Sequence, residues 1–148
     1  MHLALYQPDI PQNTGTLIRL GACLGVPIDI VEPCGFVFSD ARLRRAGMDY
    51  LDQAEVTRHP SWDDFRAARA GRRLVLLTTK ATQSYLDFVF QPADVLLLGR
   101  ESEGVPEDVH RQADAKLRIP MKARSLNVAL AGAIVLAEAL RQTAGFPA

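Results

Sequence analysis

The sequence predicts an α/β fold with a mostly parallel sheet and helices on both faces. Short apolar runs alternate with helical stretches along the 148 residues, which is the β-α-β-α order of such folds. Two of the runs, 73–79 (RLVLLTT) and 94–99 (DVLLLG), are almost continuously apolar, as strands buried on both faces of a parallel sheet are. Since no repeat, low-complexity tract or linker interrupts the pattern, we expect a single domain over 1–148 without an appended module.

The expected elements follow one another closely. Strands are predicted at 2–6, 27–31, 55–58, 73–79, 94–99 and 115–119, and helices at 13–25, 39–47, 61–71, 106–113 and 126–143. Residues that favour a helix start stand at or near the beginning of four helices: Asn13 or Thr14, Ser39, Ser61 and Pro106. Glycines that end helices follow the first three: Gly25, Gly47 and Gly71.

Charge and composition exclude several classes of protein. Seventeen basic residues balance seventeen acidic ones, so any nucleic-acid binding must rest on a local patch. The two cysteines, Cys23 and Cys34, and three scattered histidines lack the spacing of zinc ligands, and we expect no metal site. Cys23 lies among apolar residues and is expected to be buried.

No segment suggests export or insertion into a membrane. The start, MHLALYQPDIPQ, lacks the basic region of a signal peptide, and the uncharged run Val128–Ala137 is about half the length that spans a bilayer. We therefore expect a cytoplasmic protein.

Three strand ends are predicted to meet where ligands bind in open α/β sheets, beyond the carboxyl ends of the strands. Their sequences are LLTTK, LLLGRESEGVP and LRIPMKARSLN. The loop 99–104 (GRESEG) matches neither a P-loop nor the G-x-G-x-x-G fingerprint of dinucleotide sites. Gly99 either serves a tight turn or lets a flat ligand approach the backbone.

Other polar residues allow two interpretations each. Asn13 is explained by a helix cap, and Arg19 by a surface position, if each is considered alone. The basic clusters 42–45 and 71–73 are either solvated faces or contacts to phosphates.

Taken together and in order, three motifs are more specific than any of these residues. NTGTLIR, LGRESEGVP and RIPM…SLNVA resemble the signature motifs of the SPOUT-class RNA 2′-O-ribose methyltransferases, and the resemblance covers essentially the whole chain. LYQPDIPQNTG, RRAGMDY and LTTKAT are similar to the minimal single-domain branch. That branch methylates the 2′-hydroxyl of the wobble nucleotide, cytidine or modified uridine at position 34, in certain leucine tRNAs.

The resemblance implies a cofactor, a topology and a set of site residues. The cofactor is S-adenosylmethionine, bound without a metal in a deep C-terminal trefoil knot. Its pocket is implied at Leu77, Gly99, Ile119, Met121 and Ser125. Arg19 matches the catalytic arginine of the family, and the other motif positions, which support the active site and the bound RNA, are Asn13, Glu101, Ser125 and Asn127. The chain departs from the branch in a shorter 121–125 segment and in Ala137 and Leu140, which replace aromatic residues.

The resemblance also implies a homodimer that binds the anticodon stem-loop of tRNA. Its interface uses the first and last helices, so a partner would cover the open face of Val128–Ala137, where Ala129, Ala131, Gly132 and Ala133 permit close packing. A helix buried within one chain is the alternative. Ser125 is expected to cap this last helix. Two other functions stay open: a related enzyme that methylates another tRNA, rRNA or base, and a non-catalytic RNA- or nucleotide-binding domain.

Overall fold

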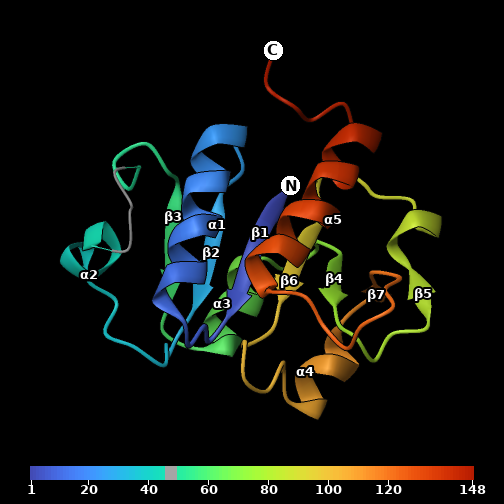
Figure 1. The fold of residues 1–148 in the computed structure, drawn as a ribbon, viewed down its shortest axis with the longest axis horizontal. Coiled ribbons are helices and arrows are strands. Elements are labelled where there is room, and N and C mark those ends of the chain that lie inside the picture. Colours follow the sequence, from blue (N-terminus) through green and yellow to red (C-terminus); the bar gives the residue numbers. More distant parts are fainter. Residues whose placement is uncertain (46–49) are drawn as a thin grey trace.

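The computed structural model describes residues 1–45 and 50–148 and contains a seven-stranded sheet with helices on both faces (Figure 1). The strands are β1 (His2–Tyr6), β2 (Ile28–Val31), β3 (Val56–His59), β4 (Leu74–Leu77), β5 (Gln83–Ser84), β6 (Val95–Leu98) and β7 (Ala115–Arg118). Their order across the sheet is β3-β2-β1-β6-β4-β7-β5, and every neighbouring pair is parallel. The predicted α/β class is therefore confirmed.

The helices form one layer on each face of the sheet. They are α1 (Pro11–Leu24), α2 (Asp40–Arg45), α3 (Trp62–Ala68), α4 (Glu107–Gln112) and α5 (Val128–Gln142), with a short 3-10 turn at Tyr85–Asp87. Side chains of β1 alternate between two cores: Leu3 and Leu5 face α1, α2 and α5, whereas Ala4 and Tyr6 face α3 and α4. In Figure 1, α5 lies beside α1 on the first of these faces.

Several predicted helix ends are confirmed. Gly25 ends α1 in the left-handed conformation, with φ 66°. Ser61 caps α3 by accepting a hydrogen bond from the Asp64 backbone N–H at 3.1 Å. Ser39 accepts in the same way from the N–H of Arg42 at 3.3 Å. Gly47, the expected end of the second helix, lies outside the described residues.

Other ends differ from the prediction. Helix α1 begins at Pro11 with Ile10 as its N-cap, not at Asn13 or Thr14, because a proline at the first helical position already has the required φ. Pro106 is itself the N-cap of α4 rather than its first residue. Helix α3 ends at Ala68, before Gly71. Strand β5 and the 3-10 turn were not predicted, since neither forms an apolar run.

The apolar helix α5 is only half covered within the chain. Ala129, Val135 and Leu136 are buried, and a Cβ atom at Gly132 would lie 2.7 Å from Leu98 Cδ1, so this face packs tightly on the sheet. Ala129 and Gly132 thus contact their own chain rather than a partner. The opposite face is exposed, with Leu130 at 58% and Ile134 at 40%. Complete burial within one chain is therefore excluded.

Two other features of the fold are the exposure of Cys23 and the length of its helices. Cys23 is exposed on the single chain, so the expected burial of this thiol is wrong: it projects from α1 away from the sheet. Among the helices of the described residues, none has the length and apolar character needed to cross a membrane.

Candidate active site

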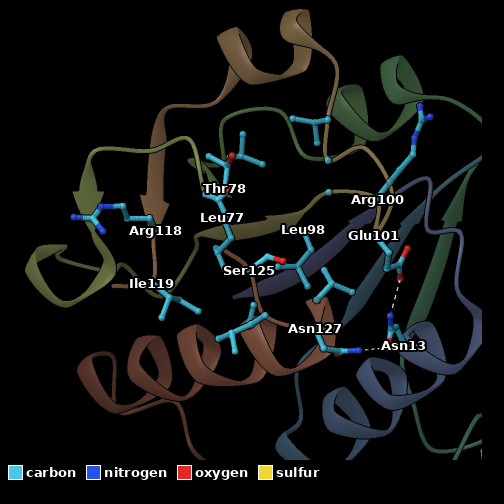
Figure 2. A pocket seen from close by; sticks show the side chains of 18 of the residues that line it. Asn13, Leu77, Thr78, Leu98, Arg100, Glu101, Arg118, Ile119, Ser125 and Asn127 are labelled. Atoms are coloured by element: carbon cyan, nitrogen blue, oxygen red, sulfur yellow. Dashed lines mark hydrogen bonds between the residues drawn. The ribbon is translucent and has the colours of Figure 1, made fainter. Parts of the chain in front are cut away.

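A pocket of about 360 Å³ lies at the carboxyl ends of β4, β6 and β7. The three strand-end loops selected from the sequence converge here, as expected for parallel strands. All five residues predicted to contact the cofactor line the pocket: Leu77, Gly99, Ile119, Met121 and Ser125. Figure 2 shows Leu77, Ile119 and Ser125 on different sides of the same space. Leu98 and Leu117 add to a largely apolar wall.

The glycines of the 99–104 loop are required by the loop itself. The backbones of Arg100 and Gly104 exchange two hydrogen bonds, of 2.9 and 3.0 Å. A Cβ atom at Gly99 would lie 2.7 Å from the Gly104 backbone, and Gly104 has φ 68°. The tight turn therefore explains both glycines without a ligand, which favours the first of the two interpretations of Gly99.

A chain of hydrogen bonds crosses the pocket wall from α5 to the loop after β6 (Figure 2). Asn127 Oδ1 accepts from the backbone N–H groups of Ala129 and Leu130, at 2.9 and 3.3 Å, and thereby caps α5. Its Nδ2 is then free to donate to Asn13 Oδ1 at 2.9 Å. Asn13 Nδ2 in turn approaches Glu101 Oε1 at 3.4 Å. The helix cap thus fixes the orientation of both amides.

This geometry corrects two predictions. Asn127, rather than Ser125, caps α5, because Ser125 precedes the helix by three residues and lies on the exposed loop at the pocket. Asn13 is a buried residue inside the first turn of α1, and its side chain serves the polar chain instead of capping the helix.

Asp9, which the sequence did not indicate as a site residue, holds Glu101 in place. The Asp9 N–H donates to Glu101 Oε2 at 2.9 Å, and the Glu101 N–H donates to Asp9 Oδ1 at 3.1 Å. The Ser102 hydroxyl also donates to Asp9 Oδ2. The only available signal was the position of Asp9, in the loop after β1, three residues beyond its end.

The pKa values of the two carboxyl groups are shifted in opposite directions. Burial, and then the contact between its carboxyl group and that of Asp9, raise the pKa of Glu101. The same contact between the two carboxyl groups is the main cause that lowers the pKa of Asp9. Glu101 is therefore the member of the pair that takes up a proton first as the pH falls.

Arg19 is the one predicted site residue that does not line the pocket. It lies on the exposed side of α1, with its guanidinium carbon 4.7 Å from the centroid of the Tyr50 ring. Six residues along a helix correspond to about 600°, so Arg19 points about 120° away from Asn13. The structure thus separates Arg19 from the polar chain within the single chain.

The basic clusters have different environments. Arg42 and Arg45 are exposed on α2, and Arg44 pairs with the exposed Asp52 at 3.2 Å. Arg73 instead donates to Asp94, a fully buried carboxylate, and is a structural residue. In the described part of the chain, no group of three or more His, Cys, Asp and Glu side chains is arranged to hold a metal ion.

Comparison with known sequences identifies a family and close relatives. The model of the SpoU rRNA Methylase family matches residues 1–137. A tRNA (cytidine(34)-2′-O)-methyltransferase of Beijerinckia indica subsp. indica is 64% identical over 144 residues, covering 95% of this chain and 90% of the relative. The protein of the same name from Escherichia coli (strain K12) is 42% identical over 151 residues, covering 99% and 96%.

Solved structures agree with this relationship. A structure described as giving insights into the 2-OH methylation of C/U34 on tRNA has a TM-score of 0.90 at 40% identity, covering 95% of this chain and 94% of that one. The SpoU methyltransferase AviRb from Streptomyces viridochromogenes, in complex with the cofactor AdoMet, has a TM-score of 0.83 at 28% identity, covering 96% and 60%.

Proposed function

The chain belongs to the SpoU rRNA methylase family, and we propose that it methylates the ribose 2′-hydroxyl of nucleotide 34 in the anticodon loop of tRNA, with leucine tRNAs as the substrates. The names of its relatives and the structural neighbour for C/U34 methylation support the position of the methyl group. The observation that supports this chemistry most directly is the polar chain from Asn127 through Asn13 to Glu101 on the wall of the pocket.

The pocket suits S-adenosylmethionine, which supplies the methyl group on a sulfonium. Its volume of about 360 Å³ lies within the usual range for cofactor sites. The apolar walls formed by Leu77, Leu98 and Ile119 fit an adenine ring, and the loop backbones beside them offer polar groups for the rest of the molecule. We infer that Gly99, Met121 and Ser125 contact the cofactor from the same loops.

We assign the catalytic work of the chain to positioning and electrostatics. Asn127 and Asn13 are held rigidly by the cap of α5, so their amides can orient the acceptor ribose without reorganising. Glu101, fixed by Asp9, accepts hydrogen bonds at the far end of the same wall. A guanidinium is always cationic in proteins, so Arg19 would clamp a phosphate and stabilise the developing alkoxide rather than remove a proton. The proton of the 2′-hydroxyl leaves to a phosphate oxygen or to water as the methyl group is transferred.

Arg19 can fulfil this role if it belongs to the site of a second protomer. We propose a homodimer in which α1 and α5 of each chain meet those of the other. The exposed apolar side chains of Leu130 and Ile134 on α5 favour such an interface, and Arg19 lies on the exposed side of the neighbouring α1. Two protomers packed through these helices would share their sites symmetrically.

Three further proposals follow from family membership. The chain forms one catalytic domain over 1–148. Its last loops and α5 form a deep trefoil knot, a proposal supported by the insertion of β6 between β1 and β4 and of β7 between β4 and β5. The enzyme acts in the cytoplasm, where tRNA is its substrate.

Mass-spectrometric mapping of ribose methylation tests the proposed function. Transfer RNA from cells without the gene should lack 2′-O-methylation at nucleotide 34 of leucine tRNAs, and the purified protein with S-adenosylmethionine should restore it. Methylation at another nucleotide or in rRNA would identify a different member of the family. Absence of any methyl transfer, together with RNA binding, would favour a non-catalytic domain.

A further inference from the structure

A second cleft, of about 330 Å³, lies at the same edge of the sheet as the active-site pocket, beyond the ends of β2 and β3. It shares no lining residue with the pocket. Its walls include two aromatic rings, Phe36 and Phe38, and the guanidinium of Arg58. Because only seven residues line it, this cleft suits one small planar group.

The planar groups of this cleft are held in fixed positions. The rings of Phe36 and Phe38 are stacked, with centroids 6.5 Å apart and planes inclined by 22°. The guanidinium carbon of Arg58 lies 4.4 Å from the centroid of the Phe38 ring. Glu32 orients this guanidinium, since Arg58 Nε and Nη2 both donate to Glu32 Oε1, Nε at 2.6 Å. The cleft thus presents aromatic and guanidinium planes whose orientation needs no ligand.

The charges around the cleft are compatible with an RNA strand. Burial raises the pKa of the Cys34 thiol to about 11, so this wall residue stays uncharged at neutral pH. The negative charge of Glu32 is paired with Arg58. Helix α2 begins two residues after Phe38 and adds the exposed Arg42 and Arg45. Exposed arginines of this kind are suited to phosphate contacts.

The loop after β1 contacts both the cleft and Glu101 on the wall of the pocket. The N–H of Gly35, between the cleft residues Cys34 and Phe36, donates to the carbonyl of Pro8 at 2.9 Å. A Cβ atom at Gly35 would lie 2.6 Å from Asp9 Cβ, and Asp9 holds Glu101. Strands β2 and β6 are separated only by β1, so their ends lie two strand spacings apart, about 10 Å. A few nucleotides of single-stranded RNA span such a distance.

We propose that this cleft binds one base of the substrate RNA that flanks the methylated nucleotide, an inference that rests on the proposed tRNA methyltransferase function. Proteins recognise single-stranded RNA by stacking splayed bases on aromatic rings and arginine planes, both of which this cleft supplies. The stacked base fixes the register of the loop, so that the correct ribose enters the pocket. The site therefore contributes to the choice of nucleotide rather than to the chemistry.

Coupling between protein and RNA variants tests this site. The probes are anticodon stem-loops of a tRNA that the wild-type protein methylates, each with one abasic nucleotide at a loop position other than 34. Binding is measured by fluorescence anisotropy. One abasic substitution should weaken binding to the wild type by about 5- to 100-fold, the usual loss of one stacked base. The same abasic substitution should weaken binding to the Phe38→Leu variant by less than about 3-fold, because this variant has no ring at position 38 on which the base could stack.

Two more variants keep the test independent of folding. Arg58→Lys changes a half-exposed side chain and should also reduce the abasic penalty, because an ammonium has no plane on which a base can stack. Val37→Ala is the matched control. Val37 lies between the two phenylalanines in sequence but outside the cleft, and it is 66% exposed, so the full penalty should persist.

The two proposals fail in different ways. If the wild-type protein methylates no tRNA, the proposed function fails and the base site fails with it. If methylation of nucleotide 34 is intact but every abasic position gives the same penalty in the wild type, Phe38→Leu and Arg58→Lys, the cleft binds no base, and the methyltransferase function stands.

Discussion

Asn127 both caps the first turn of α5 and donates to the polar chain on the wall of the pocket. Two substitutions separate the contribution of the cap from that of the donor. Asn127→Asp keeps an oxygen that accepts from the N–H groups of Ala129 and Leu130, and its negative charge is favourable at a helix N-terminus. It cannot donate to Asn13. Asn127→Ala removes both the cap and the donor.

The structure gives different stability losses for the two variants. Asn127→Ala loses a helix cap, about 1 kcal/mol, and leaves the buried Asn13 Oδ1 without its donor, about 1–3 kcal/mol, so about 2–4 kcal/mol in total. In Asn127→Asp, Asn13 can rotate its amide and donate to the new carboxylate. Its long bond to Glu101 is then lost, about 0.5–1.5 kcal/mol, and the helix dipole returns about 0.3–1 kcal/mol. Asn13 Oδ1 then faces Glu101 Oε1, and this contact of two acceptors is relieved when Glu101, whose pKa is raised, takes up a proton.

The rate of methyl transfer should fall in Asn127→Asp although its stability is nearly kept. Rotation of Asn13 reverses the donor and acceptor on the pocket wall, so Asn127→Asp should lose about 10²–10³ in the rate of methyl transfer while staying within about 1.5 kcal/mol of wild-type stability. Single-turnover transfer to tRNA measures the rate, and urea unfolding followed by circular dichroism measures stability. Near-normal transfer by Asn127→Asp, or a stability loss equal to that of Asn127→Ala, would refute the proposed role of the polar chain.

Three further predictions concern the dimer and the carboxylate pair. Leu130→Glu should give a folded monomer in light scattering, because Leu130 is exposed on the single chain but would be buried at the proposed interface. Arg19→Ala and Asn127→Asp, each inactive alone, should regain about a quarter of wild-type activity when mixed and allowed to exchange subunits, because half of the dimers then contain one intact shared site. Asp9→Asn should shift the acid limb of the pH–rate profile to lower pH: Glu101 must be ionised to accept hydrogen bonds on both of its oxygens, and its pKa is raised by burial and then by the Asp9 carboxyl group.

Each of these predictions has a contradicting result. A Leu130→Glu protein that remains dimeric would exclude α5 from the interface. Mixed Arg19→Ala and Asn127→Asp subunits that stay inactive, although mass spectrometry shows mixed dimers, would place Arg19 in the site of its own protomer or outside the mechanism. An acid limb that stays in place in Asp9→Asn, with stability measured in parallel, would mean that Glu101 does not control the profile.

The fold was predictable because burial on both faces leaves a continuous apolar run in each central strand. The runs at 73–79 and 94–99 became β4 and β6, in the middle of the sheet. Strand β5 was missed because an edge strand of two polar residues, Gln83 and Ser84, leaves no such run. The order of strands could not be derived from local pattern, since it depends on which later strand inserts between earlier ones.

The meeting of the three strand-end loops at one site was predictable for a different reason. Parallel strands end at one edge, so the loops beginning near Leu77, Gly99 and Ile119 had to meet there. The hydrogen bonds that join the site residues to one another could not be derived from the sequence. The bond between Asp9 and Glu101 joins residues 92 positions apart, and no spacing rule connects them. The local pattern alone explains Asn13 as a helix cap, because capping statistics describe a local preference. The family resemblance placed Asn13 in the site, where it bonds to Glu101 and Asn127.

The position of α5 explains why a polar loop precedes such an apolar helix. Its inner face must be apolar because Val135 and Leu136 fill the core, and Gly132 allows the helix to approach Leu98. Its first turn must be polar because Asn127 satisfies the free N–H groups there and directs the amides of the pocket wall. A partner bound to the outer face would therefore press on the same rigid helix that orients the proposed active site. Dimerisation and catalysis would then depend on one element, and a folded monomer should be slow even with all of its pocket residues intact.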